Sequence, residues 1–206
     1  MADNHELQRM RAKVEAINAL PTVPSNLRKI SVMLEKPRLT MDEIARFVVN
    51  DPALTTKVLR MVNSAAYGFP GRISSVSHAI MLLGLNVIRG LLLGVSVFDL
   101  MQKNMVGLWE HSCACAVAAR CIAQQKKMKE PEEVSICGLL HDIGKAIVML
   151  QYPSEYEQAL REAKEKNTSL YDAEKKYFAA THADAGFWLA QKWRFPANLV
   201  EAIGYH

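Results

Sequence analysis

Length and composition describe an ordinary globular chain of 206 residues, 50% hydrophobic and 22% charged, which is enough for one substantial core without cross-links. The formal net charge is only +4, and lysine and arginine are dispersed along the sequence, which disfavours nucleic acid as a partner. The four cysteines lack zinc-knuckle or CxxC spacing and the N-terminus lacks a basic and apolar leader, so we expect a cytoplasmic protein with buried thiols.

The chain is predicted to be helical throughout. Hydrophobic residues recur at intervals of three and four over residues 7–20, which puts them on one face of an opening helix. Thr40-Met41-Asp42-Glu43 is a capping box, and Asp51-Pro52 and Pro131-Glu132-Glu133 mark further helix starts. No segment shows the alternation that is typical of a β-strand. The sequence therefore predicts an all-α bundle of many helices.

The most hydrophobic stretch runs from Ile80 to Leu100, and Asn86, Arg89 and Asp99 interrupt it. The uncharged runs between these residues are too short to cross a bilayer as a helix. We therefore expect no membrane insertion.

A change in character falls near Gln102-Lys103-Asn104, where the apolar helix ends in polar residues. We expect two subdomains of one domain: an N-terminal helical part over residues 1–102 and a helical core over 103–206 that carries the candidate site. An alanine-rich helix over 108–123 is expected to run through the centre of this core, because small residues permit close approach of other helices.

The most informative segment is Leu139-Leu140-His141-Asp142-Ile143-Gly144-Lys145, because it places an imidazole and a carboxylate side by side in an apolar helix expected over 131–150. Burying either group costs several kcal/mol unless it is hydrogen-bonded, ion-paired or bound to metal. On one continuous helix His141 and Lys145 share a face, and Asp142 lies about 100° round the axis. The doublet therefore needs partners, and Lys145 is expected near any bound anion.

Three other histidines stand in helical contexts and can supply nitrogen ligands: His111, His182 and His206. With His141 and Asp142 they make a cysteine-free shell of the mixed kind that Zn, Fe, Mn or Ni accepts in open, reactive sites. The alternative is that His141 and Asp142 only brace the bundle through hydrogen bonds. The remaining histidines, His5 and His78, are interpreted as packed or surface residues.

Five further segments point to one known family: Leu20-Pro21-Thr22-Val23-Pro24, Asn50-Asp51-Pro52-Ala53-Leu54, Val62-Asn63-Ser64-Ala65-Ala66-Tyr67-Gly68, Ile80-Met81-Leu82-Leu83-Gly84 and Trp193-Arg194-Phe195-Pro196. With the His141-Asp142 doublet, they resemble the HDOD family. These are the HD-related output domains of bacterial signalling proteins, a branch of the HD superfamily of metal-dependent phosphohydrolases. The resemblance covers nearly the whole chain and implies an HD-type helical bundle.

The resemblance also implies a metal site. Metal-binding HD proteins carry a helix histidine, the HD doublet, a lysine and further histidines, matched in order by His111, His141, Asp142, Lys145, His182 and His206. Gly107 stands where many members have a glutamate ligand, and no second terminal histidine, final aspartate or Gly-Tyr-Pro segment occurs in these residues. We therefore expect at most one well-occupied position for a divalent transition metal.

Three functions stay open. The resemblance favours a signalling output or scaffold module that acts with other signalling proteins and in which a metal or nucleotide has a structural or sensory role. The alternative is a metal-dependent phosphohydrolase acting on a nucleotide or cyclic dinucleotide, with Asp142 and Lys145 as catalytic residues, Lys145 steadying phosphate charge. A nucleic-acid-binding regulator is least favoured. The sequence leaves the oligomeric state open.

Overall fold

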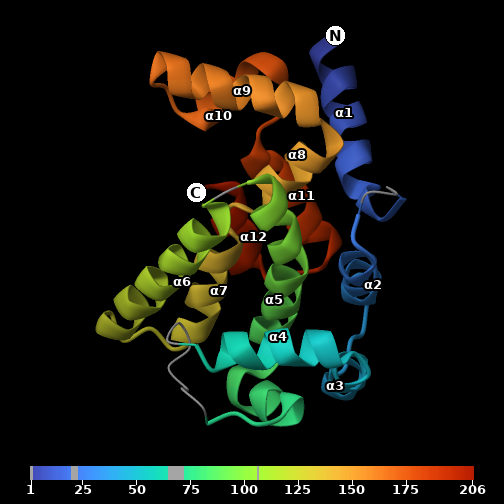
Figure 1. The fold of residues 1–206 in the computed structure, drawn as a ribbon, viewed down its shortest axis with the longest axis vertical. Coiled ribbons are helices and arrows are strands. Elements are labelled where there is room, and N and C mark those ends of the chain that lie inside the picture. Colours follow the sequence, from blue (N-terminus) through green and yellow to red (C-terminus); the bar gives the residue numbers. More distant parts are fainter. Residues whose placement is uncertain (1, 20–22, 65–71, 106) are drawn as a thin grey trace.

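The structure is a computed structural model that describes residues 2–19, 23–64, 72–105 and 107–206. It is a stack of helices (Figure 1), and no described residue lies in a β-strand. The predicted all-α class is therefore confirmed. Residues 20–22 and 65–68 of the family-specific segments lie outside the described residues.

The first half of the chain forms α1 (Ala2–Glu15), the 3-10 helix η1 (Ile17–Ala19), α2 (Ser25–Leu34), α3 (Met41–Val49) and α4 (Pro52–Val62). The long helix α5 (Val76–Asn104) follows. The second half forms α6 (Leu108–Gln125), α7 (Pro131–Leu140), α8 (Ile143–Gln151), α9 (Pro153–Lys166), α10 (Leu170–Tyr177), α11 (His182–Lys192) and α12 (Ala197–Gly204).

The predicted capping residues begin their helices as expected. At α3, the Glu43 backbone N–H donates to Thr40 Oγ1 at 3.2 Å, and the Thr40 N–H donates to the Glu43 carboxylate at 3.0 Å. At α4, Asp51 accepts from the Leu54 N–H at 3.0 Å, with Pro52 in the first turn. Each such cap contributes about 1 kcal/mol.

Helix α5 runs through the middle of the molecule, between α2 and α3 on one side and α6 and α7 on the other (Figure 1). It bends at Gly84, whose φ of 78° is in the left-handed region, which accounts for a glycine at this position. The window Val76–Val97 has the length and composition of a membrane span, so the expectation that this stretch is too short is wrong. However, 72% of the window is buried in the protein, as in a core helix.

One hydrophobic core draws on both halves of the chain. Trp193 is buried and its indole N–H donates to Ser31 Oγ at 2.6 Å. The buried Arg89 of α5 donates to the backbone carbonyls of Trp193 and Arg194 and lies over the Phe195 ring. The Trp193-Arg194-Phe195-Pro196 segment thus ties the C-terminal helices to α5 and α2. The division near residue 102 stays a prediction.

Helix α6 lies at the side of the bundle, against α7 (Figure 1). Its residues Val117 and Ile122 are 39% and 58% exposed, so the expectation that it runs through the centre is wrong. Its small residues admit α7, while α5 takes the central position. Cys121 on this helix is exposed and Cys113, Cys115 and Cys137 are partly buried, so the expectation of four buried thiols is also wrong.

Candidate metal centre

His141 and Asp142 lie between two helices. Helix α7 ends at Leu140 and α8 begins at Ile143, so the single helix expected over 131–150 is wrong. At Asp142, a residue type that is unfavourable in helix interiors, the partners of the carboxylate compete with continuation of the helix. Asp142 occupies the N-cap position of α8, yet its side chain accepts no capping hydrogen bond. Its two oxygens are thereby left for other partners.

All of the candidate ligands gather around the Asp142 carboxylate. They line one cavity of about 540 Å³ together with Lys145: His111, His141, Asp142, His182 and His206. The histidines come from α6, the α7–α8 junction, the first turn of α11 and the residues after α12. Neither His5 nor His78 lines this cavity.

The two oxygens of Asp142 face different partners. Near Oδ2 lie His141 Nε2 at 3.2 Å, His111 Nε2 at 3.5 Å and Lys145 Nζ at 2.7 Å. Near Oδ1 lie His206 Nε2 at 3.2 Å and His182 Nε2 at 3.7 Å. Asp142 is 1% exposed, and none of the described residues donates a hydrogen bond to its Oδ1. The carboxylate therefore bridges two half-sites.

In three of the histidines a hydrogen-bond acceptor next to Nδ1 fixes the tautomer. His141 Nδ1 is 2.8 Å from the Gly138 carbonyl, and His206 Nδ1 is 2.9 Å from the Ile203 carbonyl. His182 Nδ1 is 2.6 Å from the Glu174 carboxylate. Since these acceptors have no proton to give, Nδ1 carries the hydrogen, and in the neutral ring Nε2 presents a lone pair to the cavity.

Two imidazole nitrogens whose lone pairs face each other are stabilised by a positive charge between them. His182 Nε2 and His206 Nε2 are 3.2 Å apart, and His111 Nε2 and His141 Nε2 are also 3.2 Å apart. Two acceptors at this distance repel each other unless a proton or a cation lies between them. The Oδ1 half-site, where both tautomers are fixed, therefore favours cation binding or imidazole protonation, whereas on the Oδ2 side His111 can instead donate from Nε2–H to the His141 lone pair.

The pKa values of Asp142 and His141 reflect opposing effects of burial and of neighbouring charges. Burial by itself raises the pKa of Asp142, but His141, His206 and Lys145 outweigh burial and hold the pKa well below its usual range. Burial lowers the pKa of His141, but the adjacent Asp142 carboxylate and the Gly138 carbonyl raise it by more. Asp142 therefore stays ionised among the imidazoles, where its charge favours cations as partners.

The distances within each half-site suit a transition metal. His111 Nε2, His141 Nε2 and Asp142 Oδ2 are separated by 3.2, 3.2 and 3.5 Å. His182 Nε2, His206 Nε2 and Asp142 Oδ1 are separated by 3.2, 3.2 and 3.7 Å. Ligand atoms that share a metal at about 2.1 Å lie about 3.0 to 3.4 Å apart. Four of the six separations lie in this range, and the other two, 3.5 and 3.7 Å, exceed it by a few tenths of an ångström. The residues present thus fit a metal, with two imidazoles and one carboxylate oxygen on each side.

Glu174 is a site residue that the sequence analysis missed. It is fully buried on α10, and its Oε2 accepts from both the backbone N–H and the Nδ1 of His182, at 2.8 and 2.6 Å. A carboxylate behind a histidine fixes the ring orientation and raises its basicity as a metal ligand. Because Glu174 is one of several charged residues in the segment Leu170–Tyr177, the sequence did not indicate that its side chain is buried.

Two glycines let the helices approach closely enough to form the centre. A Cβ on Gly144 would lie 1.8 Å from the His182 carbonyl oxygen, so α8 crosses α11 in direct backbone contact. A Cβ on Gly138 would lie 2.7 Å from the Cys115 carbonyl oxygen, so α7 crosses α6 in the same way. These crossings bring His182 and His111 to the doublet.

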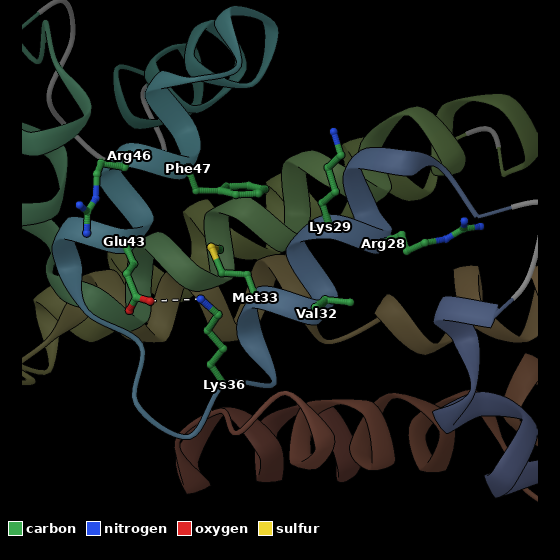
Figure 2. Close-up of a pocket in the computed structure, with 8 residues that line it drawn as sticks. All are labelled: Arg28, Lys29, Val32, Met33, Lys36, Glu43, Arg46 and Phe47. Atoms are coloured by element: carbon green, nitrogen blue, oxygen red, sulfur yellow. Dashed lines mark hydrogen bonds and ion pairs between the residues drawn. The ribbon is translucent and has the colours of Figure 1, made fainter.

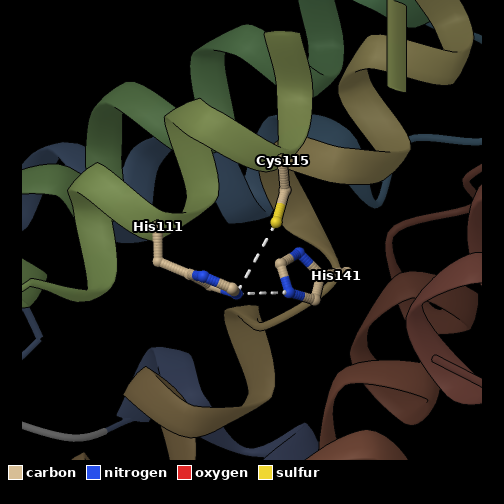
Figure 3. A group of neighbouring side chains, drawn as sticks. All are labelled: His111, Cys115 and His141. Carbon is tan, nitrogen blue, oxygen red and sulfur yellow. Dashed lines mark hydrogen bonds between the residues drawn. The ribbon is translucent and has the colours of Figure 1, made fainter. Parts of the chain in front are cut away.

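One departure from the family pattern has a structural counterpart. Gly107 precedes α6 with a φ of 88°, so a glutamate at this position would be strained. On the same helix Cys115 Sγ lies 3.6 Å from His111 Nε2 (Figure 3). A cysteine thus lies next to the predicted set of ligands, which itself contains none; the ligand set stays a prediction.

A second cavity, of about 580 Å³, lies between α2 and α3 (Figure 2). Apolar side chains and five charged ones line it: Arg28, Lys29, Val32, Met33, Lys36, Glu43, Arg46 and Phe47. Lys36 is paired with Glu43 at 3.1 Å. Four basic residues of the segment 28–46 thus lie around this cavity.

Comparison with known proteins agrees with this architecture. The model of the family described as "HDOD domain" matches residues 20–206. An uncharacterized protein of Treponema pallidum (strain Nichols) is 28% identical over 98% of this chain and 41% of its own length. The chain thus spans less than half of that curated relative.

Two further relatives are similar to this chain over different shares of its length. The crystal structure of an HDOD domain protein with unknown function from Geobacter sulfurreducens has a TM-score of 0.66 and 29% identity, covering 96% of this chain and 70% of that one. Ribonuclease Y of Mycoplasmoides gallisepticum is 35% identical over 50% of this chain but only 15% of its own length. With the family model matching most of its length, the chain belongs to the HDOD domain family.

Proposed function

We propose that this protein is an HDOD-type signalling output module whose His–Asp centre holds a divalent transition metal and binds a phosphorylated ligand. The observation that supports this most strongly is the set of imidazole lone pairs around the buried Asp142. His141, His182 and His206 each commit Nδ1 to an acceptor and leave Nε2 facing the carboxylate. Such a set is stabilised by a cation, whereas hydrogen-bonded bracing would alternate donors with acceptors.

The two sides of the centre differ in their readiness for metal. On the Oδ1 side, His182, His206 and an unpartnered carboxylate oxygen would hold a metal without displacing any group. On the Oδ2 side, a metal would compete with the Lys145 ammonium, which is 2.7 Å from that oxygen. We therefore expect the first equivalent of metal on the Oδ1 side.

The open cavity around the centre suits a phosphorylated small molecule. Lys145 lines the cavity with the histidines and can pair with phosphate oxygens. Tyr171 and Tyr205 also line it and are 43% and 79% exposed. Lys175 lies over one face of Tyr171 and Phe187 packs against Tyr205, but both rings keep exposed surface on which a nucleobase could stack. A nucleotide is thus the ligand class that the lining favours.

Phosphoester hydrolysis is the second candidate. It is favoured by the presence of only three protein ligands on the Oδ1 side, since catalytic metal sites keep a position open. A metal there supplies Lewis acidity and a bound water of lowered pKa. In that reaction Lys145 would neutralise the phosphate, while Glu174 would hold His182 in its binding orientation.

The test uses metal-reconstituted protein and a panel of nucleoside monophosphates, cyclic nucleotides and cyclic dinucleotides. We expect calorimetric binding of at least one nucleotide that is lost in Lys145→Ala and after chelation, and retained in the control Lys166→Ala on the exposed end of α9. If the protein released phosphate from a nucleotide faster than about 1 per second, the hydrolase would be favoured. Absence of metal uptake and of nucleotide binding would contradict the proposal.

A further inference from the structure

A cysteine lies beside the two histidines of the Oδ2 side. Cys115 follows His111 by four residues on α6, so the two side chains share one helix face. Figure 3 shows the Cys115 sulfur and both imidazoles directed toward one another. Cys115 Sγ is 3.6 Å from His111 Nε2, and the three potential ligand atoms of Cys115, His111 and His141 lie within 4.8 Å of one another.

We propose that Cys115 is a fourth protein ligand of the metal position formed by His111, His141 and Asp142 Oδ2. This inference depends on the metal centre proposed above and assigns one more residue to it. As the sulfur–metal bond forms, the thiol releases its proton to solvent and binds as a thiolate. No oxidant or reductant takes part.

The observed spacing agrees with a shared metal. Sulfur binds zinc at about 2.3 Å and imidazole nitrogen at about 2.0 to 2.1 Å, so tetrahedral geometry puts the two ligand atoms about 3.5 Å apart. Cys115 Sγ and His111 Nε2 are 3.6 Å apart, and the two imidazole nitrogens are 3.2 Å apart. Asp142 Oδ2 lies 3.5 Å from His111 Nε2 and 3.2 Å from His141 Nε2, and the metal would replace the Lys145 ammonium that neutralises this oxygen at 2.7 Å.

A fourth ligand changes what this position can do. Four protein ligands saturate a tetrahedral metal, as in structural zinc sites, whereas three leave room for water or substrate. The Oδ2 side, filled after the Oδ1 side because its metal must displace Lys145, would then hold a coordinatively saturated metal, with a thiolate that favours softer metals such as zinc over magnesium. Only the Oδ1 side, with His182 and His206, would stay open to a phosphorylated ligand.

Cobalt(II) loading of the whole protein provides a direct spectroscopic test. Thiolate ligation gives an intense near-ultraviolet charge-transfer band, while imidazole and carboxylate ligands give only weaker visible bands. We expect this band in the wild type, its loss in Cys115→Ser, and its retention in Cys121→Ser, whose cysteine is exposed farther along α6. Cys115→Asp should bind cobalt without the band, because it offers an oxygen ligand in place of sulfur.

Zinc X-ray absorption gives a second readout. We expect a zinc–sulfur distance of about 2.3 Å in the wild type and in Cys121→Ser, and its disappearance in Cys115→Ser. Affinity for the second equivalent of metal should fall at least about tenfold in Cys115→Ser. Loss of a group that only orients a ligand already weakens metal binding by about that factor, and loss of a ligand should cost no less.

The outcomes separate this inference from the function on which it rests. Cobalt bound without a thiolate band overturns the role of Cys115 and leaves the metal centre standing. A band that persists in Cys115→Ser also overturns it, because another cysteine would then be the ligand. Failure of the folded wild type to bind cobalt or zinc overturns the metal centre and this inference together.

Discussion

Replacing Glu174 with glutamine tests whether this residue supports metal binding through His182. Glu174 is fully buried and accepts two hydrogen bonds from His182, at 2.6 Å from Nδ1 and 2.8 Å from the backbone N–H. Glutamine keeps the size and an acceptor oxygen but removes the charge. The contribution of each hydrogen bond then decreases from about 1.5 to 3 kcal/mol, as is typical of charge-assisted bonds, to about 0.5 to 1.5 kcal/mol, as is typical of neutral ones.

The loss should be felt mainly in the metal-bound state. Metal binding places positive charge on the His182 ring, and the Glu174 carboxylate stabilises that charge, so we expect Glu174→Gln to weaken metal affinity about 10- to 100-fold. That range corresponds to about 1.4 to 2.7 kcal/mol. In the metal-free protein the same change also removes the buried negative charge of Glu174, to whose Oε1 no described residue donates a hydrogen bond. Because removal of this charge offsets the weaker hydrogen bonds, the free energy of unfolding should fall by less than about 1 kcal/mol.

The assay is calorimetric titration with zinc together with urea denaturation of the metal-free protein. Glu162→Gln is the matched control, because Glu162 of α9 contacts Lys166, Lys176 and Tyr177 and does not line the cavity. Equal zinc affinity in the two variants would refute the assigned role of Glu174. A loss of metal-free stability larger than the loss of affinity would show that Glu174 only braces the fold.

Three further changes test the packing of the helices and the charge of the centre. Gly144→Ala puts a Cβ 1.8 Å from the His182 carbonyl oxygen and should cost about 3 kcal/mol or more by urea denaturation; a loss below about 1 kcal/mol would contradict the close crossing of α8 and α11. Arg89→Met leaves the Trp193 and Arg194 carbonyls without their donor and should cost about 2 to 4 kcal/mol, with an unchanged urea midpoint as the contrary result. Because the pKa of His141 is raised, its pairing stabilises the metal-free protein fully below about pH 6.5, the unfolded value, and this contribution is lost as pH rises through the folded pKa. Metal needs the neutral ring, so zinc affinity should instead rise from about pH 6 to about pH 8; equal affinity at both would exclude His141 as a ligand.

The sequence was informative where a residue type has one strong local meaning. The Thr40 and Asp51 caps could be predicted because their side chains bond to backbone groups only a few residues away. The candidate ligands could be predicted to converge because imidazoles and a carboxylate in apolar helices need shared partners. Their roles as ligands stay a prediction.

Other features depend on contacts between distant segments, which a single sequence does not encode locally. The break at Asp142 follows from competition between helix continuation and the carboxylate's tertiary partners, so a continuous helix was the wrong expectation. Glu174 is buried only because α10 brings it behind His182. Cys115 joins the centre because Gly138 admits α6 against α7. The basic cavity between α2 and α3 likewise exists only after folding.

The most direct test of the account is the metal content of untagged protein after reconstitution and gel filtration, measured for the wild type, Asp142→Asn and His5→Ala. Asp142 bridges the two half-sites, whereas His5 is exposed and outside the cavity. The account predicts at least one equivalent of zinc, iron or manganese in the wild type and in His5→Ala, and less than about a tenth of that in Asp142→Asn. Metal-free wild-type protein, or equal metal in folded Asp142→Asn, would contradict it.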